Sequence, residues 1–427
     1  MQQKIKIRNL GPIKKCEICV DDFTILTGPQ ASGKSTIARA IYFFRTLKDD
    51  IFEQITHRPS EEEYENNINR AVEKRLRSKF LRIFGSTWSM EKDMSMQYQY
   101  APHVKIRAYL EPDHNHSYRN FVRFELDDKI YDFLRSYEEH EYIWDQDAAR
   151  QKLRQEINEL FKDEYETIYI PAGRSLITVL TDRLAAIMDA DDRTLDYCMR
   201  SYIRLTLNKR AEFKEGTTGL LEEKIHTTQV KVDRAKLELL QRIMDKVLQG
   251  RYSYQMGEER LKLKEHRYVK INYASSGQQE VVWVFNLLYY YLLERNPIFL
   301  IIEEPEAHLY PDAQKAITEA LGIFGHERNQ VMMTTHSPYI LGELNNLLFA
   351  NMIPDYLYDK LPMSAIELLP ADSTSVGHVK DGYVKNGIND GFIQNELIDG
   401  ASDEINDEMQ TLMELSWQAE KENEKTK

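Results

Sequence analysis

Residues 28–36 read Gly-Pro-Gln-Ala-Ser-Gly-Lys-Ser-Thr and directly follow the strand-like run Phe-Thr-Ile-Leu-Thr at 23–27. They fit the pattern G-x-x-x-x-G-K-[ST], a loop that wraps nucleotide phosphates between a strand and a helix. Glycines let successive N–H groups point inward at an anion, the lysine adds a positive charge, and the serine hydroxyl suits Mg²⁺. Periodic apolar residues after the loop predict a helix whose positive dipole end faces the phosphates. This stretch therefore predicts a nucleotide-binding strand–loop–helix unit.

Length and charge narrow the class of protein. At 427 residues the chain is long enough for one elaborated domain or two to three ordinary ones. Its formal net charge of −13 argues against a surface that is basic overall, so any nucleic-acid contact needs a local patch. The longest uncharged apolar run, 281–293, is too short to span a bilayer as a helix. We therefore expect a buried helix there, no signal peptide and no membrane contact.

The chain contains three cysteines, Cys16, Cys19 and Cys198. The spacing of the first two is typical of redox or zinc sites, but they lie in an expected strand, where positions i and i+3 face opposite sides. The pattern favours ordinary reduced cysteines and a cytoplasmic protein.

Patterning divides the chain into four segments. Residues 1–47 are predicted to hold two strands and the phosphate loop with its helix. Residues 48–164 alternate helical and strand-like pieces and read as an inserted α+β lobe. Residues 165–350 carry the remaining signals, including a helix predicted over 217–248. We expect 351–427 to be a mostly helical C-terminal extension with a disordered end.

A second signal is the apolar run Phe-Leu-Ile-Ile at 299–302, which ends in Glu303, Glu304, Pro305 and Glu306. A continuous apolar run suits a parallel strand covered on both faces. Carboxylates at its C-terminal end would lie where open α/β sheets bind ligands. One could hold Mg²⁺ and another could activate the attacking water. The alternative is an acidic helix start after the strand.

Two further segments suit phosphate chemistry. Ala-Ser-Ser-Gly-Gln at 274–278 precedes a long apolar helix, so its N–H and hydroxyl groups could face a phosphate; the alternative is a plain helix-capping turn. Val-Met-Met-Thr-Thr-His-Ser-Pro at 331–338 reads as a buried strand ending in polar residues. His336 at that strand end is either structural or a partner of the γ-phosphate.

The ordered set of phosphate loop, Ser-Ser-Gly-Gln, Ile-Ile-Glu-Glu-Pro-Glu-Ala-His-Leu-Tyr-Pro and Thr-Thr-His-Ser-Pro resembles ABC-type ATPases. Within them it resembles the branch of RecF and structural-maintenance-of-chromosomes (SMC) heads. It is most similar to the ATPase modules of overcoming-lysogenisation-defect (OLD) nucleases and related prokaryotic anti-phage ATPases. The resemblance covers about 1–47 and 250–349, and Tyr-Ile-Pro-Ala-Gly-Arg-Ser at 169–175 also resembles a segment of these proteins. It implies an α/β ATPase head with a mixed central sheet and flanking helices.

The resemblance also implies roles for individual residues. Glu304 would be the catalytic carboxylate and His336 the γ-phosphate sensor, while Ser35 and Glu303 would serve Mg²⁺; many ABC enzymes have Asp where Glu303 stands. The residues implied to bind ATP phosphates are Gly28, Pro29, Gln30, Ala31, Ser32, Gly33, Lys34, Ser35 and Thr36. The signature loop, which in this family contacts ATP on the opposite subunit, corresponds to Ser275, Ser276, Gly277 and Gln278. A single-headed chain therefore implies a homodimer or larger even assembly with ATP between heads.

Some features depart from the family. The signature reads Ala-Ser-Ser-Gly-Gln rather than Leu-Ser-Gly-Gly-Gln, and no glutamine-loop residue is identified. The 240 residues from Thr36 to Ser276 are too few for a long coiled-coil arm. The 89 residues after Pro338 lack the clustered acidic motifs of an OLD nuclease domain.

These features favour a dimeric ATPase that gates a separately encoded effector, a nuclease or toxin, in anti-phage defence. The alternatives are a RecF-like ATPase that binds DNA or RNA directly, and a scaffold that ATP holds together with negligible turnover.

Overall fold

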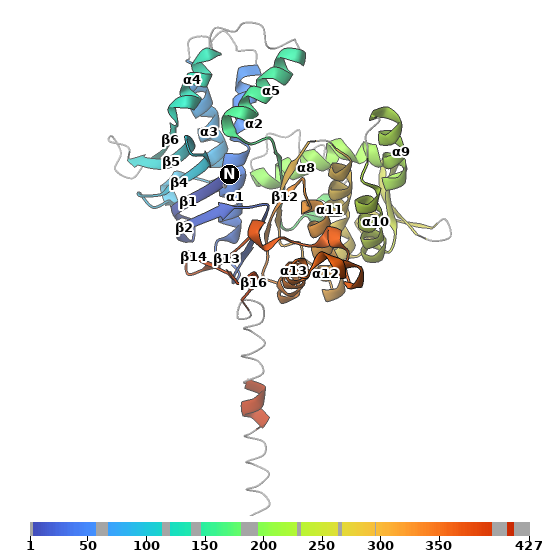
Figure 1. Cartoon of the computed structure of the whole chain (residues 1–427). Coiled ribbons are helices and arrows are strands. Elements are labelled where there is room, and N and C mark those ends of the chain that lie inside the picture. Colours follow the sequence, from blue (N-terminus) through green and yellow to red (C-terminus); the bar gives the residue numbers. More distant parts are fainter. Residues whose placement is uncertain are drawn as a thin grey trace, which may run out of the picture.

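An eleven-stranded sheet forms the centre of the molecule (Figure 1). The computed structural model describes residues 3–56, 67–112, 120–137, 147–180, 195–228, 232–263, 267–294, 296–394 and 408–413. From one edge to the other, the strands are β6 (Asn120–Leu126), β5 (Val104–Pro112), β4 (Ser95–Ala101), β1 (Gln3–Leu10), β2 (Ile13–Val20), β14 (Tyr383–Asn386), β13 (Thr374–Lys380), β3 (Phe23–Thr27), β12 (Gln330–Thr334), β11 (Ile298–Glu303) and β7 (Glu166–Ile170).

Two smaller sheets and the helices complete the described fold. One small sheet consists of β8 (Arg251–Gln255), β9 (Glu258–Lys262) and β10 (Tyr268–Lys270), the other of β15 (Ile388–Asn389) and β16 (Phe392–Ile393). The α-helices are α1 (Lys34–Arg45), α2 (Leu47–Thr56), α3 (Ile68–Phe84), α4 (Asp128–Ser136), α5 (Asp147–Phe161), α6 (Ser175–Val179), α8 (Tyr197–Lys209), α9 (Gly216–Thr228), α10 (Arg234–Leu248), α11 (Ser276–Leu293), α12 (Pro311–Gly325) and α13 (Pro338–Asn351). Within these residues, no helix has both the length and the apolar character that crossing a bilayer requires.

The large sheet is mixed. Strands β13, β3, β12, β11 and β7 run parallel to one another, whereas β2, β1, β4, β5 and β6 pair antiparallel in turn. Strand β14 joins the two halves, being antiparallel to β13 and parallel to β2. The predicted α/β class with a mixed central sheet and flanking helices is confirmed.

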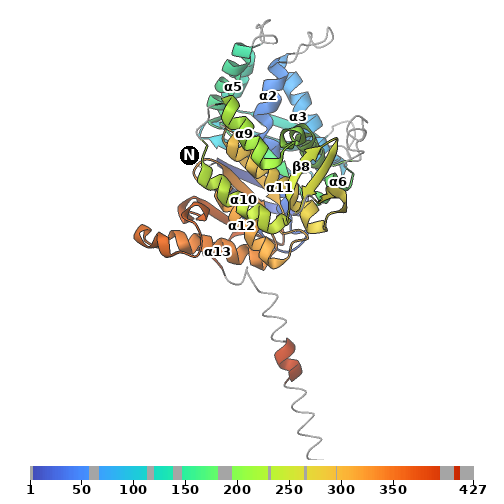
Figure 2. The same cartoon turned by 90° about the vertical axis from the view of Figure 1, so that its right-hand side faces the viewer.

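The parallel strands are buried on both faces, as the unbroken apolar run of β11 predicts. Ile298, Leu300 and Ile302 pack into one core with side chains of α10 to α13. Phe299 and Ile301 pack on the other face with side chains of α1, α2, α3 and α5. Figure 2 shows the helices on the first of these faces, α10 to α13, together with α9. The helix expected over 281–293 is α11, and nearly all of its side chains are buried.

The antiparallel half of the sheet has one buried face. Ile5 and Ile7 of β1 are almost fully buried, while Lys6 and Arg8 between and beside them are exposed, as period-two alternation requires. Strands β4 to β6, which lie in the predicted lobe, extend this same sheet from β1. In β2 the alternation leaves Cys16 buried and Cys19 half-buried, and burial raises the pKa of Cys16 to about 12.

Two expectations about secondary structure are wrong. The described part of 351–394 is not mostly helical, because β13 and β14 insert into the middle of the large sheet beside β3 and β2. The short run Thr374–Lys380 becomes a strand through pairing with residues some 350 positions away, which local propensity does not encode. The helix predicted over 217–248 is two helices, and Asp233 caps the second by accepting a hydrogen bond from the backbone N–H of Lys236. The predicted disorder of the last ten residues lies outside the described residues.

Candidate nucleotide site

The predicted phosphate loop connects β3 to α1, and its backbone demands glycine at two positions. Gly28 has φ +140° and Gly33 has φ +108°, a region that side chains rarely tolerate. A Cβ on Gly28 would lie 2.2 Å from the carbonyl oxygen of Val379 in β13, and one on Gly33 would lie 2.4 Å from Cδ1 of Ile13. The loop is therefore held against two strands, with the first turn of α1 opening at Lys34.

Lys34 lies across its own loop. Its Nζ donates hydrogen bonds to the carbonyl oxygens of Gly28, at 2.7 Å, and Pro29, at 2.9 Å. Burial lowers the pKa of Lys34, and the carboxylates of Glu304 and Glu306 oppose this by raising it. Both carboxylates thus lie close enough to act on this ammonium group. Phosphates entering the loop would take over from the two carbonyl oxygens as acceptors.

The strand register brings the separate motifs to one edge of the sheet. Thr334 of β12 pairs with Leu26 of β3 on one side and with Glu303 of β11 on the other. The phosphate loop, the acidic run and the Thr-Thr-His segment therefore leave three neighbouring parallel strands at the same end. Ligands in open α/β sheets bind beyond the carboxyl ends of the strands. The fold brings together residues that are about 300 positions apart in the chain.

Glu303 ends β11 with its side chain 2% exposed. Its Oε2 accepts a hydrogen bond from the backbone N–H of Ala172 at 3.2 Å, and its buried Oε1 has no hydrogen-bond partner among the described residues. A buried carboxylate fits a cation, although the Tyr169 hydroxyl also interacts with Glu303, and Ser35 lies in the first turn of α1, on the loop–helix unit that follows β3. No cluster of three His, Cys, Asp or Glu side chains suited to a metal occurs in the described ranges. Mg²⁺ bound with substrate phosphates needs only one or two carboxylates, so these residues fit it.

Glu304 and His336 face each other across the strand ends. Glu304 has φ +42°, a left-handed conformation that is uncommon for a residue with a side chain. Its backbone N–H donates to the carbonyl oxygen of Thr334 at 2.9 Å, which fixes this turn to β12. The Glu304 carboxylate lies 3.7 Å from Nδ1 of His336, whose side chain is half exposed. A carboxylate and an imidazole therefore share an accessible position next to the phosphate loop.

Glu306 is a buried carboxylate that contacts the segment carrying His336, and the sequence did not reveal this role. It is 6% exposed, and its Oε1 accepts hydrogen bonds from Oγ1 of Thr335, at 2.7 Å, and from the backbone N–H of His336, at 2.9 Å. The same oxygen lies 3.6 Å from Nδ1 of His336. The only sequence signal was a third carboxylate in the acidic run. Glu306 thus positions the histidine loop relative to Glu304.

Arg174, which the sequence marked only by resemblance, joins three parts of the site. It is 1% exposed and donates to the carbonyl oxygens of Pro171 (3.1 Å), Glu280 (3.0 Å), Glu303 (2.8 Å) and Glu304 (3.0 Å). Its Nε also lies 3.5 Å from Oε2 of Glu280, whose Oε1 accepts from the backbone N–H of Ser175. Because Glu280 lies in α11, the first turn of the signature helix is tied to both acidic residues of β11.

The signature loop forms the start of α11. Ser275 is the N-cap, and its side chain and that of Gln278 form a reciprocal capping box. Ser276 is exposed, and a Cβ on Gly277 would lie 3.0 Å from the carbonyl oxygen of His308. The capping turn considered for this segment is therefore present, while an exposed hydroxyl remains beside it. Among the described residues, no hydrogen bond or ion pair joins 275–278 to 28–36 of the same chain.

His378 is a further residue near the loop that the sequence missed. It pairs with Thr27 in the β13–β3 register and immediately precedes Val379, against which Gly28 packs. Burial lowers the pKa of His378, and the charges of Lys380, Lys385 and Lys34 lower it further. The imidazole is therefore neutral at physiological pH. Its place depends on the pairing of β13, for which the sequence carries no local signal.

Comparison with known proteins gives a family and a set of similar structures. No curated protein matches the chain. The Smc head domain with an extended coiled coil bound to the C-terminal domain of ScpA, from Pyrococcus furiosus, is 13% identical with a TM-score of 0.40, over 90% of this chain and 95% of that one. An Smc head bound to the C-winged helix domain of ScpA is 13% identical with a TM-score of 0.42, over 90% and 97%. The SMC head domain from Thermotoga maritima is 11% identical with a TM-score of 0.36, over 90% and 97%.

The family comparison covers most of the chain. Residues 1–341 match the family described as AAA ATPase domain. This range includes β1, the phosphate loop, the acidic run at 303–306 and the Thr-Thr-His segment at 334–336. The chain belongs to the AAA ATPase domain family.

Proposed function

We propose that this protein is an ABC-type ATPase that binds ATP with Mg²⁺ and hydrolyses it in a site completed by a second copy of the chain. One observation carries the proposal: Lys34, Glu303, Glu304 and His336 converge on one edge of the sheet, whereas no hydrogen bond or ion pair of the described residues joins the signature loop to the phosphate loop of the same chain. Such a half-site is complete only when another molecule supplies residues 275–278.

The residues divide the chemistry between them. Lys34 and the loop N–H groups bind the β- and γ-phosphates. Ser35 and Glu303 would hold Mg²⁺, which neutralises phosphate charge when bound. Glu304 orients and deprotonates the attacking water, and His336 hydrogen-bonds the γ-phosphate. Phosphoryl transfer needs positioning and charge stabilisation more than covalent chemistry, so a shared site of this kind suffices.

Exposed aromatic side chains support the dimer. Tyr273, just before the signature loop, is 77% exposed, Tyr310 at the N-cap of α12 is 76% exposed, and Tyr339 in the first turn of α13 is 55% exposed. Each follows or precedes a site motif, and the start of α12 contacts the start of α13 through Gln314 and Ser337. Tyrosine is enriched at protein–protein interfaces. The face that carries the catalytic residues is thus suited to contact another subunit.

A complementation experiment tests the shared site. Lys34→Ala removes the positive charge that binds the phosphates of ATP. Ser276→Arg places a bulky side chain in the signature loop and blocks it. Each variant alone is therefore expected to be inactive. In a mixed dimer, the Ser276→Arg chain contributes a working phosphate loop and the Lys34→Ala chain a working signature. An equal mixture should recover roughly a quarter of wild-type turnover, because half of the dimers are mixed and each has one complete site. A mixture as inactive as its components would show that the site is not shared.

The catalytic assignment has its own test. Glu304→Gln is expected to keep ATP binding and lose about 10²- to 10⁴-fold in turnover, since the water loses its base. Wild-type turnover in this variant would refute the role given to Glu304.

We further propose that head closure gates a separately encoded effector in anti-phage defence. The support is the wording of the motifs at 303–310 and 334–341, which resembles the OLD-like branch. The ATP-bound Glu304→Gln protein should retain such a partner in co-purification from its native host, and Lys34→Ala should not. Identical partners in both samples would contradict ATP-dependent gating.

A further inference from the structure

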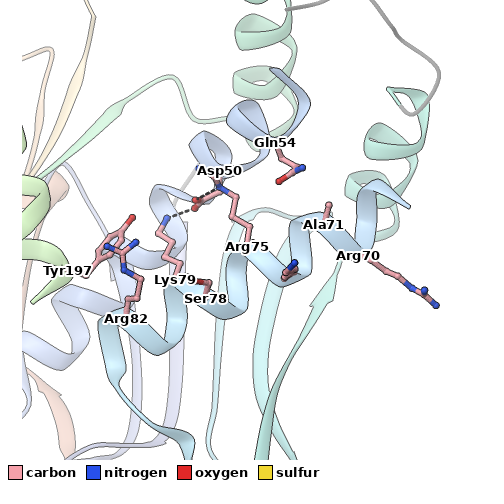
Figure 3. Close-up of a pocket in the computed structure, with 10 residues that line it drawn as sticks. Asp50, Gln54, Arg70, Ala71, Arg75, Ser78, Lys79, Arg82 and Tyr197 are labelled. Carbon is pink, nitrogen blue, oxygen red and sulfur yellow. Dashed lines mark hydrogen bonds and ion pairs between the residues drawn. The ribbon is translucent and has the colours of Figure 1, made fainter. Parts of the chain in front are cut away.

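A basic groove lies between α2 and α3, apart from the ATP site (Figure 3). It has a volume of about 560 Å³, and none of its lining residues belongs to 28–36 or to the acidic and histidine loops. Its charged lining consists of Asp50 from α2 and Arg70, Lys74, Arg75, Lys79 and Arg82 from α3. The lining thus contains five cations and one carboxylate in a chain whose net charge is −13.

Two of these cations hold the helices together. Lys79 is 5% exposed, donates to Oγ1 of Thr46 at 2.7 Å and pairs with Asp50. Arg75 donates from Nε to Asp50 at 3.1 Å and also pairs with Glu53. Figure 3 shows both side chains reaching from α3 toward Asp50. This network fixes α3 on α2 and makes the groove a preformed feature.

The remaining cations have no carboxylate partner among the residues that the structure describes. Arg70 and Lys74 are exposed, lie one turn apart on α3, and have no ion-pair partner in the part of the chain that the structure describes. Arg82 lies over the ring of Tyr197 from α8, with its guanidinium carbon 4.9 Å from the ring centroid. Even counting Glu53, which pairs with Arg75, the groove keeps a charge of 5 − 2 = +3. Unneutralised cations in a concave site attract and concentrate anions.

The spacing indicates the kind of anion. Arg70, Lys74, Ser78 and Arg82 follow one another at intervals of four residues along α3, which places them on one face over about 18 Å. That length exceeds a single phosphate and suits a row of them. A second cavity of about 980 Å³ shares Arg75, Lys79, Arg82 and Tyr197 and continues toward Arg204 of α8. Tyr197 with Arg82 offers a stacking surface of the type that binds bases.

We propose that this groove binds a second ligand that carries several phosphates, separately from the ATP of the composite site. In this proposal Arg70 and Lys74 contact phosphates, and Ser78 donates a hydrogen bond to a phosphate oxygen. Arg82 and Tyr197 bind the next phosphate or a ring of the ligand. The ligand is either a free polyphosphorylated compound of nucleotide size or the backbone of a nucleic-acid strand. Both present the same phosphate chemistry, and the experiment distinguishes them.

The test uses the full-length chain with Lys34→Ala, which disables the phosphate loop and leaves the groove as the site under study. Arg70→Ala/Lys74→Ala removes the two partnerless cations but retains the Arg75 and Lys79 links to Asp50. Arg242→Ala/Lys246→Ala is the matched control, because it removes an exposed Arg and Lys at the same spacing from α10. Calorimetry with tripolyphosphate is one arm, and anisotropy with a labelled single-stranded 12-mer, as DNA and as RNA, is the other.

The groove variant is expected to weaken at least one probe by about tenfold or more, with the control within about twofold of its parent. Loss confined to tripolyphosphate identifies a free ligand. Loss for the oligonucleotide, with the logarithmic salt slope reduced by about 1.4, identifies a strand backbone. Equal affinities in the groove and control variants would overturn the proposal, as would the absence of binding by the Lys34→Ala parent at about 1 mM of either probe. Because the ATP site is disabled throughout, this outcome is independent of the proposed ATPase activity.

Discussion

Replacing Arg174 by Met tests whether a buried arginine ties the signature helix to the acidic strand. The substitution retains much of the side-chain volume and removes the guanidinium, which donates to four carbonyl oxygens and pairs with Glu280. The four carbonyl oxygens then lose the Arg174 donors, and the Glu280 carboxylate, which is 1% exposed, keeps the Ser175 N–H but loses its only cation among the described residues.

The expected magnitude follows from burial. Removing one partner of a buried ion pair costs about 3–5 kcal/mol, because the other charge stays buried and unpaired. The freed carbonyls add to this where water cannot reach them. We expect Arg174→Met to reduce the free energy of unfolding by about 3–5 kcal/mol and to lower Tm by roughly 3–6 °C. The same substitution at Arg123, which pairs with Glu111 on the exposed surface, is expected to cost under about 1 kcal/mol.

Urea unfolding and ATP turnover separate the two roles of Arg174. Adding Glu280→Gln removes the unpaired charge, so the double variant should be more stable than Arg174→Met alone. Turnover should stay low in both, since the carbonyls of Glu303 and Glu304 no longer have the Arg174 guanidinium as a common donor. Stability within about 1 kcal/mol of wild type for Arg174→Met, or purely additive effects in the double variant, would refute the coupling.

Other residues give further predictions. Glu306→Gln keeps an acceptor for Thr335 but removes a negative charge next to His336. ATP turnover should therefore fall by roughly tenfold, while ATP affinity stays within about twofold of wild type. Unchanged turnover in a steady-state assay would contradict the positioning role of Glu306. Gly28→Ala should abolish ATP binding measured by calorimetry, because its Cβ would lie 2.2 Å from the Val379 carbonyl oxygen. Gly257→Ala is the control and should bind ATP normally, because Gly257 also has a positive φ, +79°, but has no atom within 4 Å of the added Cβ. Equal ATP binding by both variants would argue against the close contact at Gly28. Burial raises the pKa of Glu367 to about 7, with the charge of Glu319 adding to the effect. Because the folded state then holds its proton more tightly than the unfolded state, the stability associated with protonated Glu367 is lost as pH rises from about 4.5 through 7. Glu367→Gln should therefore leave stability at pH 4.5 nearly unchanged and raise it by up to about 3 kcal/mol at pH 8.5 in urea unfolding, and a gain that is the same at both values would exclude this residue as the source.

The local units of this protein follow from short-range sequence patterns. The glycines and lysine of 28–36 define a phosphate loop, the apolar run 299–302 defines a strand buried on both faces, and the pattern at 274–293 defines a capped buried helix. Each of these depends on residues within about twenty positions of one another, where backbone preferences and periodicity act directly.

How these units meet depends on long-range packing of the folded chain. Strand register aligns Leu26, Thr334 and Glu303, and β13 reaches the phosphate loop through pairing that no local pattern announces. The roles of Arg174 and Glu306 are likewise contacts between distant segments. The basic groove exists because α2 and α8 both pack against α3 and, within the described residues, leave Arg70 and Lys74 without a carboxylate partner. Hydrogen bonds and charge pairs across such distances depend on packing geometry, which sequence neighbours do not specify.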